Sequence, residues 1–172
     1  MPQNKRIPRK YQQREDNSMF DMYNIVKYFG LWILFSLIAF GIKTVVLSAI
    51  SISPTSQVGN GILTLYEVHN TGAAFNLFAG QSEAIIMASL ITVFILTIIV
   101  IIRSKKIPNS AVPAMAFLST GITMNMLERI QYGYVIDYIH CDFLNNFPVF
   151  NVPDIMIVIG TICLILAILT RR

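Results

Sequence analysis

Two aspartates, Asp137 and Asp154, are the residues of this sequence with the clearest potential for chemistry. The apolar run 155–159 follows Asp154 directly, so its carboxylate is expected at the mouth of an apolar helix rather than in solvent. Ionisable groups held against lipid are costly and usually functional. If the intervening loop folds back, the two carboxylates share a poorly hydrated site in which one is ionised and the other protonated. Such a pair can activate a water molecule for peptide hydrolysis.

The composition indicates a protein built into a membrane. Of the 172 residues, 55% are hydrophobic and only 13% are charged, with a mean hydropathy of +0.62. The apolar residues form blocks long enough to cross a bilayer, which excludes an ordinary soluble domain. The net charge of +4 comes from basic residues beside these blocks, so it indicates membrane orientation and argues against a nucleic-acid partner. Cys141 and Cys163 lack partners at zinc spacing, so we expect no metal site or disulfide.

The chain is expected to be mainly α-helical, with four transmembrane helices in a single domain over residues 29–172. Residues 1–28 are polar and basic, and are expected to form a disordered cytoplasmic tail. The alternating pattern of residues 62–68 predicts one or two short strands outside the membrane. The expected spans are Trp32–Ile52, Ala84–Ile102, Ala111–Met126 and Ile155–Thr170.

The basic residues predict how the chain crosses the membrane. Eleven of the 13 Lys and Arg residues lie in the N-terminal tail, the loop 103–106 and the C-terminus. The positive-inside rule therefore places both termini in the cytoplasm. The segments 53–81 and 129–154 then lie together on the outer face of the membrane.

These outer segments and the adjoining helix ends collect polar side chains, which must hydrogen-bond one another to be tolerated beside lipid. Adjacent helical residues do not face each other, so Arg129 is free of Glu128 and is expected to brace another carboxylate or a backbone carbonyl. Lys43 has two open interpretations, a lysine that reaches toward the interface or a functional charge. The collected residues are Lys43, Asn70, Asn125, Glu128, Arg129, Asp137, Asp142, Asn151 and Asp154.

The segment 69–76, His-Asn-Thr-Gly-Ala-Ala-Phe-Asn, is typical of a turn. A functional interpretation is that Asn70 and small residues such as Gly72 let the backbone approach a substrate chain closely. His69 and His140 are interpreted as hydrogen-bonding groups at the membrane interface rather than as catalysts. Candidates to line a lipid entrance are Phe75, Phe147 and Phe150.

Four motifs occur in order: HNTGAAF at 69–75, NMLER at 125–129, GYVIDY at 133–138 and PVFNVPD at 148–154. Together they resemble the lipoprotein signal peptidases, the signal peptidase II family of bacteria, over about Leu31 to Leu169. The resemblance implies an intramembrane aspartic endopeptidase that cleaves the signal peptide of prolipoproteins before the diacylglyceryl-modified cysteine. It also implies a small extracytoplasmic β-sheet cradle and a short amphipathic helix in the second outer segment.

Carried over residue by residue, the resemblance makes Asp137 and Asp154 the catalytic pair and Asp142 a solvated residue. One aspartate would deprotonate a water and the other would protonate the carbonyl oxygen, so no cofactor or metal is expected. The implied partners are diacylglyceryl-modified prolipoproteins and membrane lipid. The implied setting is a monomer in the bacterial cytoplasmic membrane, with its active site at the outer face. Residues that support the site or bind substrate would be Lys43, Asn70, Gly72, Asn125, Glu128, Arg129 and Asn151.

Three positions depart from the family pattern. The family usually carries an aspartate four residues before Lys43, where this sequence has Ala39, so Lys43 is expected to lack its partner. Glu128 replaces the usual aspartate and adds a methylene. Pro153 replaces a small residue before the second catalytic aspartate, and a proline is well tolerated at a helix N-terminus.

Two alternatives stay open. A catalytically degenerate relative would bind lipidated peptides without cleaving them, which the missing acid at Ala39 motivates. A small transporter or accessory subunit would use Lys43, Glu128 and Asp154 as an ion path. The transporter predicts polar residues along several helices, whereas the span 84–102 has almost none.

Overall fold

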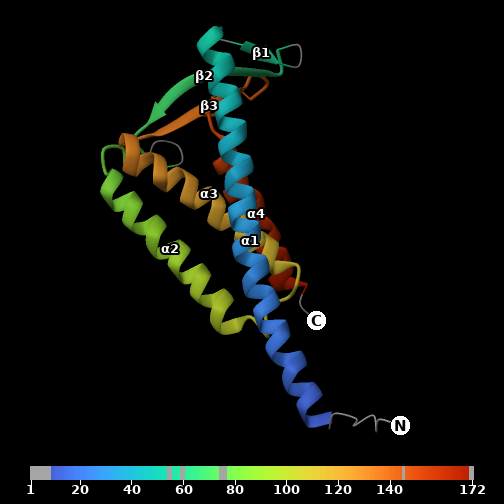
Figure 1. Cartoon of the computed structure of the whole chain (residues 1–172). Helices are drawn as coiled ribbons and strands as arrows, with labels where there is room; N and C mark the ends of the chain where they lie inside the picture. Colours follow the sequence, from blue (N-terminus) through green and yellow to red (C-terminus); the bar gives the residue numbers. More distant parts are fainter. Residues whose placement is uncertain (1–8, 54–55, 59–60, 74–76, 145, 171–172) are drawn as a thin grey trace.

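The computed structural model describes residues 9–53, 56–58, 61–73, 77–144 and 146–170, and it describes side chains from residue 22 onward except those of residues 56–58. Four helices form a bundle, and a three-stranded sheet covers one end of it (Figure 1). The mainly α-helical fold with a small sheet agrees with the sequence prediction. In chain order the elements are α1 (Arg9–Ile52), β1 (Ser56–Val58), β2 (Leu63–Asn70), α2 (Ser82–Arg103), α3 (Ala111–Tyr132), β3 (Val135–Cys141) and α4 (Val152–Leu169).

Helix α1 is longer than hydropathy predicts. It begins at Arg9 and includes 44 residues, so helix replaces the disorder predicted for the part of the tail from residue 9 to residue 28. Hydropathy identifies only the part of a helix that lipid must surround, and it misses a polar extension of the same helix. In Figure 1 this extension continues beyond the bundle at the end opposite the sheet. The first eight residues of the predicted tail lie outside the described residues.

Three of the helices are long and apolar enough to cross a membrane: α1 over Met22–Ile52, α2 over Ser82–Arg103 and α4 over Val152–Leu169. Helix α3 is less apolar because it lies among the others, contacting α1, α2 and α4. It has 22 residues, so it is about 33 Å long. It runs from the loop after α2 to the sheet at the opposite end of the bundle (Figure 1), and therefore crosses the membrane together with the other three helices.

Two glycines allow α3 and α4 to approach each other closely. A Cβ atom built on Gly121 would lie 2.4 Å from the carbonyl oxygen of Pro153, and one on Gly160 would lie 2.7 Å from the amide nitrogen of Leu118. Real Cβ atoms do not approach other atoms so closely, so any larger residue would push the helices apart. This contact sets the position of the start of α4 relative to α3.

The sheet has the order β1-β2-β3, with both pairs antiparallel. Asp137 on β3 lies opposite Val68, and Val135 lies opposite Asn70 at the end of β2. The predicted strands in the first outer segment are thus confirmed. The second outer segment differs from the prediction, because its described residues 135–141 form strand β3 and the implied amphipathic helix is absent from the described residues between α3 and α4.

Candidate active site

The C-terminal end of α3 directs the chain into the strand that carries Asp137. Helix α3 extends to Tyr132, beyond the predicted end at Met126, so Asn125, Glu128 and Arg129 all lie on it. Gly133 ends the helix in the left-handed conformation, with φ +84°, and its N–H donates to the carbonyl of Arg129. Glycine adopts this conformation without steric cost, and strand β3 can then begin two residues later.

Alternation along β3 places neighbouring side chains on opposite faces of the sheet. Asp137 faces Asn70 and Asn151 and is 2% exposed. Tyr138 faces the other way and is fully buried against Ile50 and Ile136. Its hydroxyl accepts a hydrogen bond from the N–H of Val152, at 3.3 Å, so Tyr138 ties β3 to the first residue of α4.

Asp154 lies in the first turn of α4 and takes part in a reciprocal cap. Helix α4 begins at Val152, three residues before the predicted start. The N–H of Asp154 donates to Asn151 Oδ1 at 2.8 Å, and the N–H of Asn151 donates to Asp154 Oδ2 at 3.0 Å. Pro153 is tolerated because the N–H that it lacks has no partner within the helix at that position.

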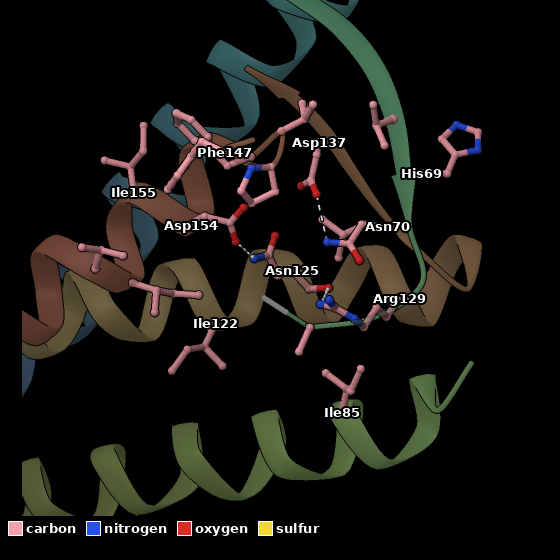
Figure 2. A pocket seen from close by; sticks show the side chains of 18 of the residues that line it. His69, Asn70, Ile85, Ile122, Asn125, Arg129, Asp137, Phe147, Asp154 and Ile155 are labelled. Atoms are coloured by element: carbon pink, nitrogen blue, oxygen red, sulfur yellow. Dashed lines mark hydrogen bonds between the residues drawn. The ribbon is translucent and has the colours of Figure 1, made fainter. Parts of the chain in front are cut away.

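Asn151 connects the two aspartates. Its Nδ2 donates to Asp137 Oδ1 at 2.7 Å and to Asn125 Oδ1 at 3.1 Å, while its Oδ1 caps the N–H of Asp154. Asn125 Nδ2 donates in turn to Asp154 Oδ1 at 2.7 Å. Figure 2 shows the two carboxylates, one from β3 and one from α4, on either side of Asn125 and pointing into the same space.

Asn70 and Arg129 hold the other side of the site. Asn70 Nδ2 donates to Asp137 Oδ2 at 3.0 Å, and its Oδ1 accepts from the N–H of Gly72 at 2.9 Å. Arg129 donates from Nη2 to the carbonyl of Gly72 at 2.5 Å and from Nη1 to the carbonyl of Asn125 at 3.2 Å. Arg129 thus braces backbone carbonyls, as the sequence predicted.

Lys43 and Glu128 form an ion pair next to β3, and neither lines the space into which the aspartates point. Lys43 Nζ and Glu128 Oε1 are 2.8 Å apart. Lys43 therefore lacks the family's usual partner at position 39, as expected, but it is not unpaired, because Glu128 on α3 takes that role across the helix interface. Asp142, predicted to be solvated, is exposed and accepts hydrogen bonds from the Thr64 hydroxyl.

The aspartates open onto a cavity of about 920 Å³. One part of its lining is polar, and the other is an apolar wall to which α2, α3 and α4 contribute. Phe147 and Phe150, two of the phenylalanines expected at a lipid entrance, line the cavity, whereas Phe75 lies outside the described residues. The polar lining includes His69, Asn70, Asn125, Arg129, Asp137 and Asp154, and the apolar wall includes Ile85, Ile122, Ile155, Val158 and Ile159.

Burial changes the acidity of the groups on β3. Removal from water, together with the nearby Asp154, raises the pKa of Asp137 to about 7 against the opposing effect of the hydrogen bonds from Asn70 and Asn151. Burial likewise raises the pKa of Tyr138 to about 12, so its hydroxyl stays neutral. Asp137 can therefore hold or release a proton near neutral pH, whereas an exposed aspartate is fully ionised there. Among the described residues, no group of three or more His, Cys, Asp or Glu side chains is placed to hold a metal ion.

Sequence reasoning did not identify every residue that builds the site. It proposed Asp137, Asp154, Asn70, Gly72, Asn125, Arg129 and Asn151, and the structure brings these together. It missed Tyr138, although period-two alternation next to Asp137 could have assigned it to the opposite face. It also missed the isoleucines of the apolar wall, because isoleucine is equally common at positions that face lipid and the sequence alone does not separate the two.

Similarity to known proteins agrees with this geometry. Residues 31–170 match the family described as "Signal peptidase (SPase) II". The chain belongs to the signal peptidase II family. A lipoprotein signal peptidase of Dehalococcoides mccartyi is 37% identical over 115 residues, covering 64% of this chain and 69% of that protein. One from Enterococcus faecalis is 34% identical over 124 residues, covering 71% and 74%.

Solved structures show the same fold. One, described as a bacterial membrane enzyme, aligns with a TM-score of 0.73 at 23% identity, covering 83% of this chain and 87% of the other. A second aligns with a TM-score of 0.71 at 22% identity, covering 84% and 94%. Membership of the signal peptidase II family indicates that this protein is a protease. Together with the three apolar helices of spanning length, it also indicates a bacterial membrane protein.

Proposed function

We propose that this protein cleaves the signal peptide from bacterial prolipoproteins before the diacylglyceryl-modified cysteine, with Asp137 and Asp154 as an aspartic catalytic pair. The observation that carries the proposal is the bridge through Asn151, whose side chain donates to the Asp137 carboxylate and whose backbone N–H donates to the Asp154 carboxylate in one cavity. A site made of two carboxylates and amide groups provides acid–base chemistry for peptide hydrolysis. The names of the matched relatives support the choice of substrate.

The surroundings of the two aspartates suggest how they divide the work. Asp154 lies at the N-terminal end of α4 and accepts hydrogen bonds from Asn125 and from the backbone N–H of Asn151. Asp137, whose pKa burial raises to about 7, can hold a proton near neutral pH. Asp154 would draw a proton from the attacking water while Asp137 gives one to the carbonyl oxygen of the scissile bond. The shared proton belongs to the pair rather than to either residue alone.

The cavity suggests how the substrate lies. The polar side offers Asn70, Arg129 and the backbone near Gly72 to an extended peptide. The apolar wall of Ile85, Ile122 and Ile155 is suited to the diacylglyceryl chains. Because lipid surrounds the bundle, the substrate would enter sideways from the bilayer and present the bond next to its lipidated cysteine to the aspartates.

The positive-inside rule supports an orientation with the site outside. The start of α1, the loop after α2 and the end of α4 lie at the end of the bundle opposite the sheet (Figure 1). These segments carry most of the Lys and Arg residues, so this end would face the cytoplasm. All residues of the proposed site come from one chain, so a monomer is sufficient for the reaction.

The test is cleavage of a synthetic peptide by the purified full-length protein in lipid. The peptide spans a lipoprotein signal sequence and carries a diacylglyceryl-modified cysteine, and mass spectrometry locates the cut. We expect one cut, immediately before that cysteine, and much slower cleavage of the same peptide without the lipid. A protein that binds the lipopeptide without cutting it would be a degenerate relative, and equal cleavage of both peptides would refute the proposed lipid specificity.

A further inference from the structure

Lys43 and Glu128 form an ion pair within the bundle, next to the proposed site but outside its cavity lining. Their charged atoms are 2.8 Å apart, with the side chains 14% and 7% exposed. Lys43 Nζ also lies 5.6 Å from the centre of the Tyr132 ring. Breaking a pair this buried leaves one charge without compensation, so the two side chains hold each other in place.

The second oxygen of the same carboxylate reaches the strand that carries Asp137. Glu128 Oε2 accepts a hydrogen bond from the N–H of Ile136 at 2.8 Å. Ile136 directly precedes Asp137, so this contact fixes the backbone immediately before the aspartate. One carboxylate therefore joins three elements: α1 through Lys43, α3 through its own backbone and β3 through Ile136.

We propose that the Lys43–Glu128 pair is a positioning device for Asp137. Lys43 orients the Glu128 carboxylate, and the carboxylate holds the Ile136 amide so that Asp137 meets Asn151 and the substrate. Neither side chain touches the cavity, so both act through Asp137. Glutamate suits this task because its carboxylate must reach α1 and β3 at once. Ala39, one helical turn before Lys43, has no acidic group to offer.

This inference rests on the proposed peptidase function, and it predicts a change in turnover rather than in substrate binding. Misplacing a reacting group by about 1 Å can cost about 100-fold in rate. Lys43→Met and Glu128→Gln should each lower kcat for lipopeptide cleavage by about 10-fold or more. The Kd for the lipopeptide should stay near that of the wild type, because the cavity lining is unchanged.

Two further variants separate positioning from folding. Lys43→Arg keeps a positive charge within reach of Glu128, and we expect it to retain most of the wild-type kcat. The double variant Lys43→Met, Glu128→Gln should lose no more than the worse single variant, because both changes break the same device. Asp142→Asn is the matched control. It removes an exposed acid directly after β3, the strand that carries Asp137, and should leave kcat unchanged.

The experiment measures kcat and lipopeptide Kd for each full-length variant in lipid, together with hydrogen exchange of the peptide containing Ile136. The expected result is a lower kcat, an unchanged Kd and faster exchange in Lys43→Met and Glu128→Gln. Unchanged kcat in both, or losses that multiply in the double variant, would overturn the inference while leaving the peptidase function intact. A wild-type protein that binds the lipopeptide without cutting it would instead refute the proposed function, and the exchange of Ile136 would still report on the contact.

Discussion

The described part of the bundle contains two buried polar clusters, and only one of them has the properties of an active site. The inner cluster, in the part of the bundle away from the sheet, joins the Tyr28 hydroxyl to Thr97 Oγ1 at 3.2 Å and Ser119 Oγ at 2.8 Å. Near it, Asn24 Nδ2 donates to the carbonyl of Ser104 at 2.8 Å. These groups are neutral, and Tyr28 packs within an apolar core that includes Leu96, Val100 and Val112.

The outer cluster around Asp137 and Asp154 combines charge with an opening. Both carboxylates face a cavity, and their polar partners come from β2, α3 and the residue before α4. Helix α3 contributes to both clusters, through Ser119 and Asn125, which are less than two turns apart. The two clusters differ in what α3 packs against. In the inner cluster α3 packs against apolar helices, and in the outer cluster it lies beside the sheet and the cavity. Buried polar groups alone therefore do not indicate a catalytic site.

Apart from the aspartates themselves, the largest loss of activity in the outer cluster should come from changing Asn151, which donates to Asp137 from its side chain and to Asp154 from its backbone N–H, and caps α4. Asn151→Asp retains a good N-cap but cannot donate to Asp137, and it adds a negative charge beside the pair. We expect cleavage to fall by about 100-fold with little loss of stability. Asn151→Leu should lose both activity and about 1 kcal/mol of stability from the cap. Lipopeptide cleavage and thermal unfolding measure the two effects separately, and wild-type cleavage by Asn151→Asp would show that the bridge is not needed.

A pH series should distinguish the charged outer cluster from the neutral inner one. The pKa of Asp137 is raised from 3.8 to about 7 in the folded protein, so the folded state binds more protons between these values. Its contribution to stability is therefore largest at low pH and decreases as pH rises through about 7, by of the order of 1–3 kcal/mol. Asp137→Asn should remove this decrease, which unfolding midpoints at pH 5 and pH 8 can check. Parallel pH profiles for both proteins would contradict the raised pKa.

Disrupting the contact between α3 and α4 should disturb the geometry of the outer cluster more than that of the inner one. Gly121→Ala places a methyl group against the carbonyl of Pro153, at the start of the helix that carries Asp154. We expect a loss of about 1–3 kcal/mol in stability, together with reduced cleavage. Gly41→Ala is the control, because its methyl group would meet nothing within 4 Å. Equal stability of the two variants in thermal unfolding would show that the helices can separate without cost.

The smallest effect should follow from a change in the inner cluster. Tyr28→Phe keeps the aromatic packing and removes the hydroxyl that contacts Thr97 and Ser119. We expect a loss of about 1 kcal/mol in stability and no change in kcat. Thermal unfolding and lipopeptide cleavage measure both quantities. A strong fall in kcat at unchanged stability would show that the inner cluster takes part in catalysis.

The sequence revealed the outer cluster because acids beside apolar helices are rare and costly. Asp137, Asp154 and their amide partners could be chosen by residue type and motif. The pairing of Lys43 with Glu128 could not, because it joins α1 to α3 across a distance of 85 positions in the chain and depends on how the two helices pack. Hydropathy located the apolar helices, with errors at their ends. The family resemblance implied an amphipathic helix in the second outer segment, whereas residues 135–141 form β3, because the pairing of β3 with β2 is a long-range contact that local pattern does not contain.

The most direct test of the aspartic pair is single-turnover cleavage of the diacylglyceryl peptide by wild type, Asp137→Asn, Asp154→Asn and Asp142→Asn. Each substitution keeps the shape of the side chain and removes a titrating group, and Asp142 lies outside the cavity lining. We expect Asp137→Asn and Asp154→Asn to bind the peptide and to cleave it at least about 1,000-fold more slowly than the wild type. Asp142→Asn should cleave normally. Near-normal cleavage by either Asp137→Asn or Asp154→Asn, in folded protein, would contradict the assignment of these two residues as the catalytic pair.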